Sequence, residues 1–271
     1  MPVTFDEASH TYTSHKGTQY ISVTTLIKKY VPEFDSHYWS TYKAMKAVLE
    51  SKNEWKKYKD NCGGWENVVA VVRADKGFKY REEVMQKKRE FLAMWAEEGK
   101  AAAARGTAYH KKREEEVRSG VTVHDSKEYY TLTGDPLASK IEADGVYPEL
   151  LLYDDELEIA GQADWVLKSG NTIHIKDYKT SKDVSKLGFM EEMLLYPLNG
   201  LLNAKFYVYS VQMSLYAYIL ERQGYDIGSL VIEHVDGRTQ ETIDVLPTSY
   251  YRDEVIALVK DWSETKKRKA A

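Results

Sequence analysis

The sequence predicts an α/β protein with a mixed central sheet flanked by helices, preceded by a helical N-terminal region. Two observations favour this class. Helical patterning dominates from about residue 36 to residue 118, whereas residues 149–178 form three successive segments typical of strands. The 271 residues suffice for one large domain or two small ones. We expect residues 1–104 to form a hairpin and a helical region, and residues 105–271 to form the α/β core.

The first predicted elements are a β-hairpin and a short helix. Residues 11–13 and 20–21 are rich in Thr, Tyr and Ile and flank a turn around Gly17. Ser22 is a favourable N-cap residue for a helix that continues to about Tyr30. The chain therefore enters its helical region directly from a hairpin.

The helical region contains several predicted helices. The pattern over residues 36–60 ends at Gly63-Gly64, and a stretch rich in Lys, Glu and Ala covers residues 80–103. Thr107 is predicted to cap a separate helix, which ends shortly before a loop over residues 121–136. A short helix is expected after that loop.

The second half of the chain alternates strands with helices. Strands are predicted at residues 149–153, 158–167 and 172–178, and the last two are joined by a turn over residues 168–171. A helix over residues 206–223, a hairpin within residues 230–246 and a last helix over residues 249–262 follow. This order predicts a mixed sheet with helices on it.

Composition excludes several classes of protein. Hydrophobic residues make up 43% of the chain, but no apolar run approaches the ~18 residues of a membrane span, and no signal peptide is evident. The single Cys62 excludes an internal disulfide, a cysteine-ligated iron–sulfur cluster and a Cys-rich zinc site. No Walker A pattern is present, so we expect no nucleotide cofactor. We expect an intracellular, cytoplasmic protein that does not bind membranes.

Charge is unevenly distributed along the chain. The net charge is −4, but residues 1–120 hold 22 Lys and Arg against 17 Asp and Glu, while the remainder holds 16 against 25. A basic first half suits phosphate groups, and an acidic second half suits cations. This asymmetry alone does not assign a function.

The predicted hairpin within residues 158–178 carries a concentration of reactive side chains. Asp177 and Lys179 are two positions apart and share one face of their strand. A tight turn brings Asp164 close to Asp177 across the ladder, and two adjacent carboxylates favour a cation such as Mg²⁺ or Mn²⁺. The backbone carbonyl of Tyr178 is a further candidate ligand. A surface hairpin with an Asp–Lys salt bridge explains the same spacing about equally well.

The motif Gly161-x-x-Asp164 followed by Asp177-Tyr178-Lys179-Thr180 resembles the signature of the PD-(D/E)XK nuclease superfamily, RecB-like branch. Arg105-Gly106-Thr107 through His110 resembles the histidine-bearing helix start of that branch, and Gln212 through Tyr216 resembles its Q-x-x-x-Y motif. The segment at residues 21–25 is similar to the opening of phage and mitochondrial-genome-maintenance exonucleases.

The resemblance implies a restriction-endonuclease-like core over residues 105–271 that cleaves DNA with Mg²⁺ or Mn²⁺. It implies metal ligation by His110, Asp164, Asp177 and the carbonyl of Tyr178, and catalytic roles for Asp164, Asp177, Lys179, Gln212 and Tyr216. The expected substrate is single-stranded DNA or DNA with free ends in a bacterial or phage-infected cell. A single-strand-binding or recombination protein is a candidate partner.

Two alternatives to an exonuclease remain open from the sequence. The chain is alternatively an endonuclease specific for a sequence or a DNA structure, or a non-catalytic DNA-binding recombination factor. The complete Asp–Asp–Lys set disfavours the non-catalytic alternative.

Other residues have weaker indications of function. Glu149 is either an additional carboxylate near the metal or a surface residue, whereas His174 is interpreted as structural. Within residues 31–100, where a DNA arch would lie, basic clusters are interleaved with aromatic residues: Lys56-Lys57, Lys87-Lys88-Arg89, Trp55, Tyr58 and Trp95. A solvated helix face is the more frequent explanation of such clusters.

Overall fold

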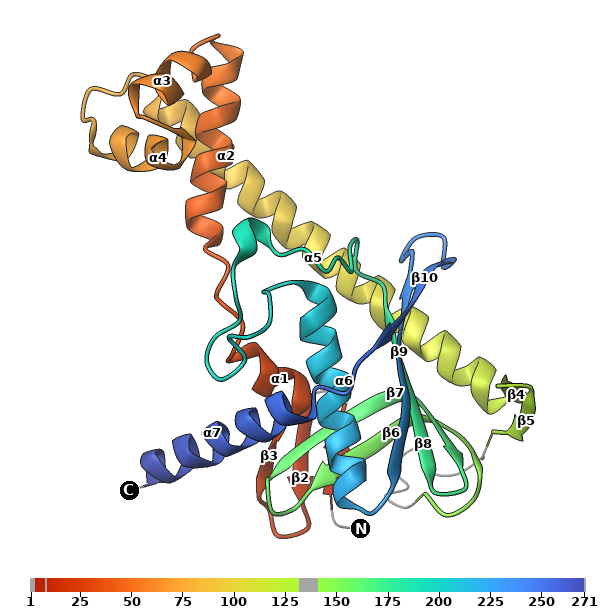
Figure 1. The fold of residues 1–271 in the computed structure, drawn as a ribbon. Coiled ribbons are helices and arrows are strands. Elements are labelled where there is room, and N and C mark those ends of the chain that lie inside the picture. Colours follow the sequence, from red (N-terminus) through yellow and green to blue (C-terminus); the bar gives the residue numbers. More distant parts are fainter. Residues whose placement is uncertain (1–2, 8, 132–140, 271) are drawn as a thin grey trace. The chain divides into compact units, whose positions relative to one another are not determined.

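The computed structural model describes residues 3–7, 9–131 and 141–270 (Figure 1). The chain divides into two compact units. The core unit comprises Met1–Pro32 and Arg105–Ala271, and the helical unit comprises Glu33–Ala104.

The core unit is built on an eight-stranded sheet in the described residues. The strands of this sheet are β1 (Val3–Asp6), β2 (Thr11–Ser14), β3 (Gln19–Ser22), β6 (Gly145–Asp154), β7 (Ile159–Ser169), β8 (Thr172–Lys179), β9 (Asp226–Val235) and β10 (Thr242–Thr248). Their order is β1-β2-β3-β7-β8-β9-β10, and β6 pairs with β7 outside this path. The pairs β3/β7 and β8/β9 are parallel and the others antiparallel, so the sheet is mixed.

Helices cover both faces of this sheet (Figure 1). One face carries α1 (Val23–Lys28), α6 (Lys205–Arg222) and α7 (Arg252–Ala270), which share the largest apolar cluster with strand residues such as Val166 and Ile175. On the other face, Tyr109 packs with Trp165 and Tyr178 in a second cluster. The predicted α/β class with a mixed sheet flanked by helices is confirmed.

The helix that carries His110 differs from the prediction. The structure contains one continuous helix, α5 (Arg81–Arg118), where the sequence predicts two, and Thr107 lies inside it and caps nothing. A glycine within a helix costs only about 1 kcal/mol relative to alanine, and the alanines at residues 101–104 favour the helical state. Residues of α5 up to Ala104 belong to the helical unit, and those from Arg105 belong to the core unit.

The helical unit has its own apolar core. It contains α2 (Ser36–Ser51), α3 (Trp55–Asn61), α4 (Trp65–Ala74) and the first part of α5. Buried residues from three of these helices, including Met45, Val69 and Val84, form one cluster. Gly63 and Gly64 interrupt the helices as predicted, and both adopt positive φ angles.

Residues 1–32 belong to the core unit, which differs from their predicted grouping with residues 33–104. β3 pairs with β7, and α1, capped by the Ser22 hydroxyl as predicted, contacts α6. Such pairing between distant segments leaves no local pattern in the sequence. The role of the N-terminal region as a DNA arch stays a prediction.

Two further segments differ from the prediction. Residues expected to form a loop instead form a hairpin of β4 (Val121–His124) and β5 (Lys127–Tyr130), and the short helix expected after them falls on residues 132–140, outside the described residues. The last helix, α7, extends through the basic tail to Ala270.

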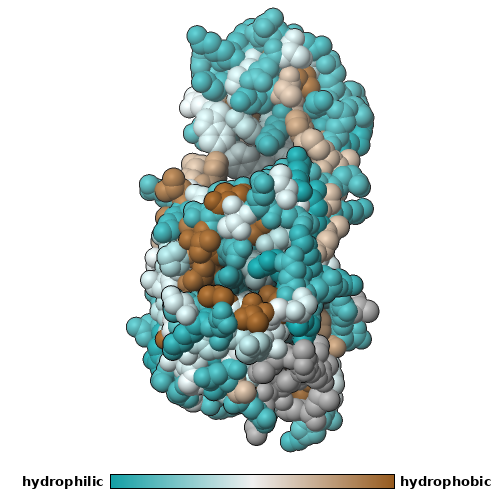
Figure 2. Space-filling view, turned by 90° about the vertical axis from the view of Figure 1, so that its right-hand side faces the viewer, coloured by the Kyte–Doolittle hydropathy of each residue, from teal (hydrophilic) through white to brown (hydrophobic). Residues whose placement is uncertain are grey.

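No helix in the described part of the chain has the length and apolar character needed to cross a membrane. The face shown in Figure 2 is mainly hydrophilic, and its hydrophobic patches are separated by hydrophilic residues.

Candidate metal centre

β7 changes its partner strand where the predicted site lies. At one end of β7, Ile159 and Ala160 pair with β3, and at the other end residues 165–169 pair with β8. Between these two ladders, residues 161–164 have no strand partner on that edge among the described strands. Side chains from neighbouring elements can therefore enter the sheet at this point.

The carboxylate of Asp164 occupies the start of this gap. Trp165 is the last residue of β7 paired with β8, opposite Lys176, so the same register would next place Asp164 opposite Asp177. Asp164 Oδ2 instead accepts a hydrogen bond of 2.7 Å from the backbone N–H of Tyr178. A side chain thus takes the place of a backbone partner, and β7 and β8 remain connected where their ladder ends.

Glu149 lies on β6, the neighbour of β7, in an unusual backbone conformation. Tyr147 and Leu150 both contribute to the large apolar cluster although they are three positions apart, so the normal alternation of faces shifts between them. Glu149 has a φ of +49°, in the left-handed region that residues other than glycine rarely adopt. Such conformations cost about 1–3 kcal/mol and occur preferentially at functional sites.

His110 reaches the same place from α5. Its Nδ1 lies 3.3 Å from Asp164 Oδ1 and 3.9 Å from Glu149 Oε1. Three candidate ligand atoms, one each from His110, Glu149 and Asp164, lie within 4.8 Å of one another. Ligands held about 2 Å from an octahedral ion lie about 3 Å apart when adjacent, so this spacing fits a small divalent cation after minor adjustment.

Asp177 is the centre of a second group of side chains beside this triad. It is 1% exposed, and its Oδ2 lies 2.5 Å from Lys179 Nζ. Gln212 Nε2 donates to Asp177 Oδ1 at 3.3 Å and also lies 3.2 Å from the hydroxyl of Tyr216. Gln212 and Tyr216 are one turn apart on α6, as the sequence predicts, and both are buried.

The triad of His110, Glu149 and Asp164 places two carboxyl groups and one imidazole close together in a poorly solvated space. Burial by itself lowers the pKa of His110, but attraction to Asp164 outweighs it and raises that pKa to about 9. Burial, together with repulsion by Asp164, raises the pKa of Glu149 to about 8. The pKa of Asp164 is lowered despite its burial because His110 lies beside it. His110 and Glu149 therefore both carry a proton at neutral pH. A divalent cation bound at this site would take the place of those protons.

Lys179 stays positively charged in this environment. Its pKa is raised in spite of burial, because Asp177 and Asp164 attract its proton. Burial raises the pKa of Asp177 to about 6, against the opposing effect of Lys179. The ammonium group of Lys179 also lies 4.8 Å from the centre of the Tyr209 ring. Tyr209 was not predicted, although its position three residues before Gln212 on α6 places it on the same helix face.

Two glycines of the sequence motifs permit close approaches at this site. A Cβ on Gly161 would lie 2.8 Å from Tyr216 Cε1 and 3.1 Å from Val23 Cγ2. A Cβ on Gly106 would lie 3.2 Å from Thr180 Oγ1, the residue after Lys179. Gly106 thus permits a close approach between α5 and the side chain of Thr180.

The structure brings together the side chains of all but one of the predicted site residues: His110, Asp164, Asp177, Lys179, Gln212 and Tyr216. The exception is Tyr178, whose ring packs on the other face of the sheet while its backbone N–H binds Asp164; its carbonyl as a ligand stays a prediction. Glu149, left open by the sequence, faces His110. His174 contacts Ser229 and His124 and lies outside this group.

Comparison with known proteins finds no family model that matches this chain and no curated protein that matches it.

Replacing Gly161 by alanine tests the packing of Tyr216 against β7. The added methyl group would overlap the buried Tyr216 ring, so we expect a loss of about 1–3 kcal/mol in the free energy of unfolding, measured by urea denaturation. Gly200→Ala is the matched control, because nothing lies within 4 Å of a Cβ there. Equal stabilities for the two variants would contradict the close approach.

Proposed function

We propose that this chain is a metal-dependent deoxyribonuclease of the PD-(D/E)XK superfamily, RecB-like branch, with a restriction-endonuclease-like core. One observation carries the proposal. Residues of four motifs that are far apart in the sequence, on α5, β7, β8 and α6, meet in one connected group. Asp164 and Asp177 are only 8% and 1% exposed, which a solvated surface salt bridge does not account for.

The residues present fit a divalent cation. His110, Glu149 and Asp164 would hold it, and Asp177 and the carbonyl of Tyr178 are the further predicted ligands. A set dominated by carboxylate oxygens suits Mg²⁺ or Mn²⁺, and the imidazole favours Mn²⁺ of the two. When bound, such an ion supplies positive charge and Lewis acidity at the reacting phosphate.

The chain's own residues orient the reacting groups. The Tyr178 N–H fixes the carboxylate of Asp164, and Lys179 and Gln212 fix that of Asp177. Lys179 keeps its proton and can stabilise the negative charge that develops on the phosphate. Tyr216 is 2% exposed, so we assign Gln212 and Tyr216 as positioning residues for Asp177 and not as groups that touch DNA.

The surface beside the site fits an anionic substrate. Three cations, Arg105, Lys182 and Arg238, and one carboxylate, Asp236, line a pocket of about 270 Å³ together with Thr180, the residue that follows Lys179. Cationic side chains bind nucleic acids chiefly through the phosphate backbone. A DNA strand lying there would have a phosphate close to Lys179.

We propose an exonuclease that acts on single-stranded DNA or on DNA ends inside a bacterial or phage-infected cell, with a single-strand-binding or recombination protein as a candidate partner. The geometry of the site suits exonucleases and endonucleases equally. The choice of an exonuclease therefore depends on the family resemblance of residues 21–25.

Substitution of the Asp177–Lys179 pair tests catalysis directly. With Mg²⁺ or Mn²⁺ present, we expect Asp177→Asn and Lys179→Met each to lower the rate of DNA cleavage by at least about 10²–10³-fold, because each removes charge fixed at the reacting phosphate. EDTA should abolish cleavage by the unsubstituted protein.

Lys176→Met is the matched control for Lys179→Met. It removes the same charge from the same strand, but Lys176 pairs with Glu233 and lies over Trp165 on the other face. Since Lys179→Met leaves Asp177 without its cation, thermal unfolding of each variant must confirm a folded protein. Cleavage by folded Asp177→Asn at the unsubstituted rate would exclude the proposed site, and absence of metal-dependent cleavage by the unsubstituted protein would favour the DNA-binding recombination factor.

The form of the DNA separates the two nuclease alternatives. We expect degradation of linear single-stranded DNA and no cleavage of closed circular DNA of the same sequence, because an exonuclease requires an end. Gel analysis of the two substrates side by side measures this. Cleavage of the circle at a comparable rate would show an endonuclease.

A further inference from the structure

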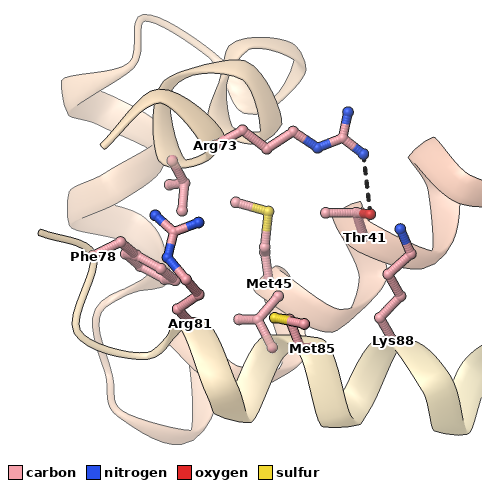
Figure 3. A pocket seen from close by; sticks show the side chains of 9 residues that line it. Thr41, Met45, Arg73, Phe78, Arg81, Met85 and Lys88 are labelled. Atoms are coloured by element: carbon pink, nitrogen blue, oxygen red, sulfur yellow. Dashed lines mark hydrogen bonds between the residues drawn. The ribbon is translucent and has the colours of Figure 1, made fainter. Parts of the chain in front are cut away.

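The helical unit contains a pocket of about 170 Å³ whose lining residues do not belong to the candidate metal centre. It lies where α2, α4 and the first part of α5 pack together (Figure 3). Of the described residues, nine line it: Thr41, Met45, Val72, Arg73, Phe78, Arg81, Val84, Met85 and Lys88. The lining combines an apolar floor with a cationic rim.

The floor is made of buried apolar side chains. Met45 is 1% exposed, Val72 is 4% exposed and Phe78 is 6% exposed, so the floor belongs to the core of the helical unit. Met85, in contrast, is 46% exposed at the edge of the pocket. Met85 thus offers an apolar surface to solvent at the edge of the pocket.

The rim carries three cations. Figure 3 shows the head groups of Arg73 and Lys88 near Thr41, and that of Arg81 on the other side of Met45. Arg73 Nη2 donates to Thr41 Oγ1 at 3.2 Å, and Arg81 Nη2 donates to the Asp75 carbonyl at 2.6 Å, so both guanidinium groups are held by uncharged acceptors. Lys88 forms no ion pair with any described residue, whereas the adjacent Lys87 pairs with Glu90.

The positive charge at the rim of the pocket has no neutralising group in the lining that the structure describes. None of the nine described lining residues carries a carboxylate, so the positive charges at the rim have no opposite charge within the lining. Basic groups on a protein surface usually have acidic neighbours, as Lys79 has Glu54 in the same unit. A bound anion would supply the opposite charge and accept charge-assisted hydrogen bonds.

We propose that this pocket binds one nucleotide unit of a DNA strand, with the phosphate at Arg73 and Lys88 and the sugar and base against Met85. The proposal rests on the proposed function for the choice of DNA as the anion. It assigns to the helical unit a strand-binding site separate from the candidate metal centre.

The size of the pocket favours a unit of a strand over a free nucleotide. Its volume is well below the roughly 300–1,000 Å³ of pockets that enclose a complete small ligand. A nucleotide of a strand needs only partial enclosure, since its neighbours add their own phosphate contacts along the surface. The flexible, exposed side chain of Met85 can accept any base, as sequence-independent binding requires.

Binding of DNA without cleavage tests the proposal. The full-length protein in EDTA is titrated against a fluorescent dT oligonucleotide of about 16 nucleotides, and anisotropy gives the affinity at several salt concentrations. We expect Lys88→Met to weaken binding about tenfold and to reduce the slope of log K against log salt by about 0.7, as loss of one phosphate contact requires. Arg73→Met should act in the same direction.

Two matched controls separate the pocket from general charge. Lys87→Met removes the same charge from the neighbouring position, where the lysine already pairs with Glu90, and should leave affinity and slope nearly unchanged. Met85→Glu places a carboxylate in the rim and should abolish the contribution of the pocket, while Gln86→Glu adds the same charge outside it. Equal effects within either pair of variants would overturn the proposal.

Free dTMP separates the two possible sources of the nucleotide. We expect unlabelled oligonucleotide to displace the labelled strand at much lower nucleotide concentration than dTMP does. Equal displacement by dTMP would assign the pocket to a free nucleotide and overturn the strand site.

Cleavage assays keep this test independent of the proposed function. If Asp177→Asn cleaves DNA at the unsubstituted rate while Lys88→Met binds weakly, the metal centre is wrong and the pocket stands. If Lys88→Met binds as the unsubstituted protein does while cleavage depends on Asp177, the pocket alone is wrong.

Discussion

The hydrogen bond from the Tyr178 N–H to the Asp164 carboxylate is the interaction on which the candidate site depends. It lies where the ladder between β7 and β8 ends, and it connects the two strands without closing the gap beside them. Through that gap, His110 on α5 and Gln212 on α6 reach the same place from opposite faces of the sheet. Continued pairing of the two strands would leave no opening for them. The geometry of the candidate site is thus a consequence of interrupted pairing.

The same interruption concentrates negative charge in a poorly solvated space. Asp164, Asp177 and Glu149 lie together, while His110 and Lys179 are the cations within the group. Glu149 holds a left-handed backbone conformation there, which is unfavourable unless the surrounding structure enforces it. A purely structural cluster would gain by replacing such groups with apolar residues. The proposed divalent cation would explain why carboxylates, an imidazole and a strained backbone coincide.

Local patterns predicted the elements well, and distant contacts explain what they missed. The alternation and turn residues of the β7–β8 hairpin were sufficient to place Asp164 beside Asp177. Thr107 was wrongly predicted to cap the start of a helix, because the close approach of Gly106 to Thr180 involves a residue far away in the sequence. Glu149 could not be assigned, since a shift in the alternation of β6 depends on a backbone angle and not on residue type. Of the three cations of the helical-unit pocket, only Lys88 was singled out from the sequence, as part of a basic run.

The central claim is that His110, Glu149 and Asp164 hold one divalent cation. Anomalous diffraction from crystals of the full chain grown with Mn²⁺ tests it most directly, because the signal locates the ion independently of activity. We predict an anomalous peak roughly 2 Å from His110 Nδ1 and from carboxylate oxygens of Asp164 and Glu149. Well-ordered crystals in which Mn²⁺ occupies only other sites, with His110 still paired to Asp164, would contradict it.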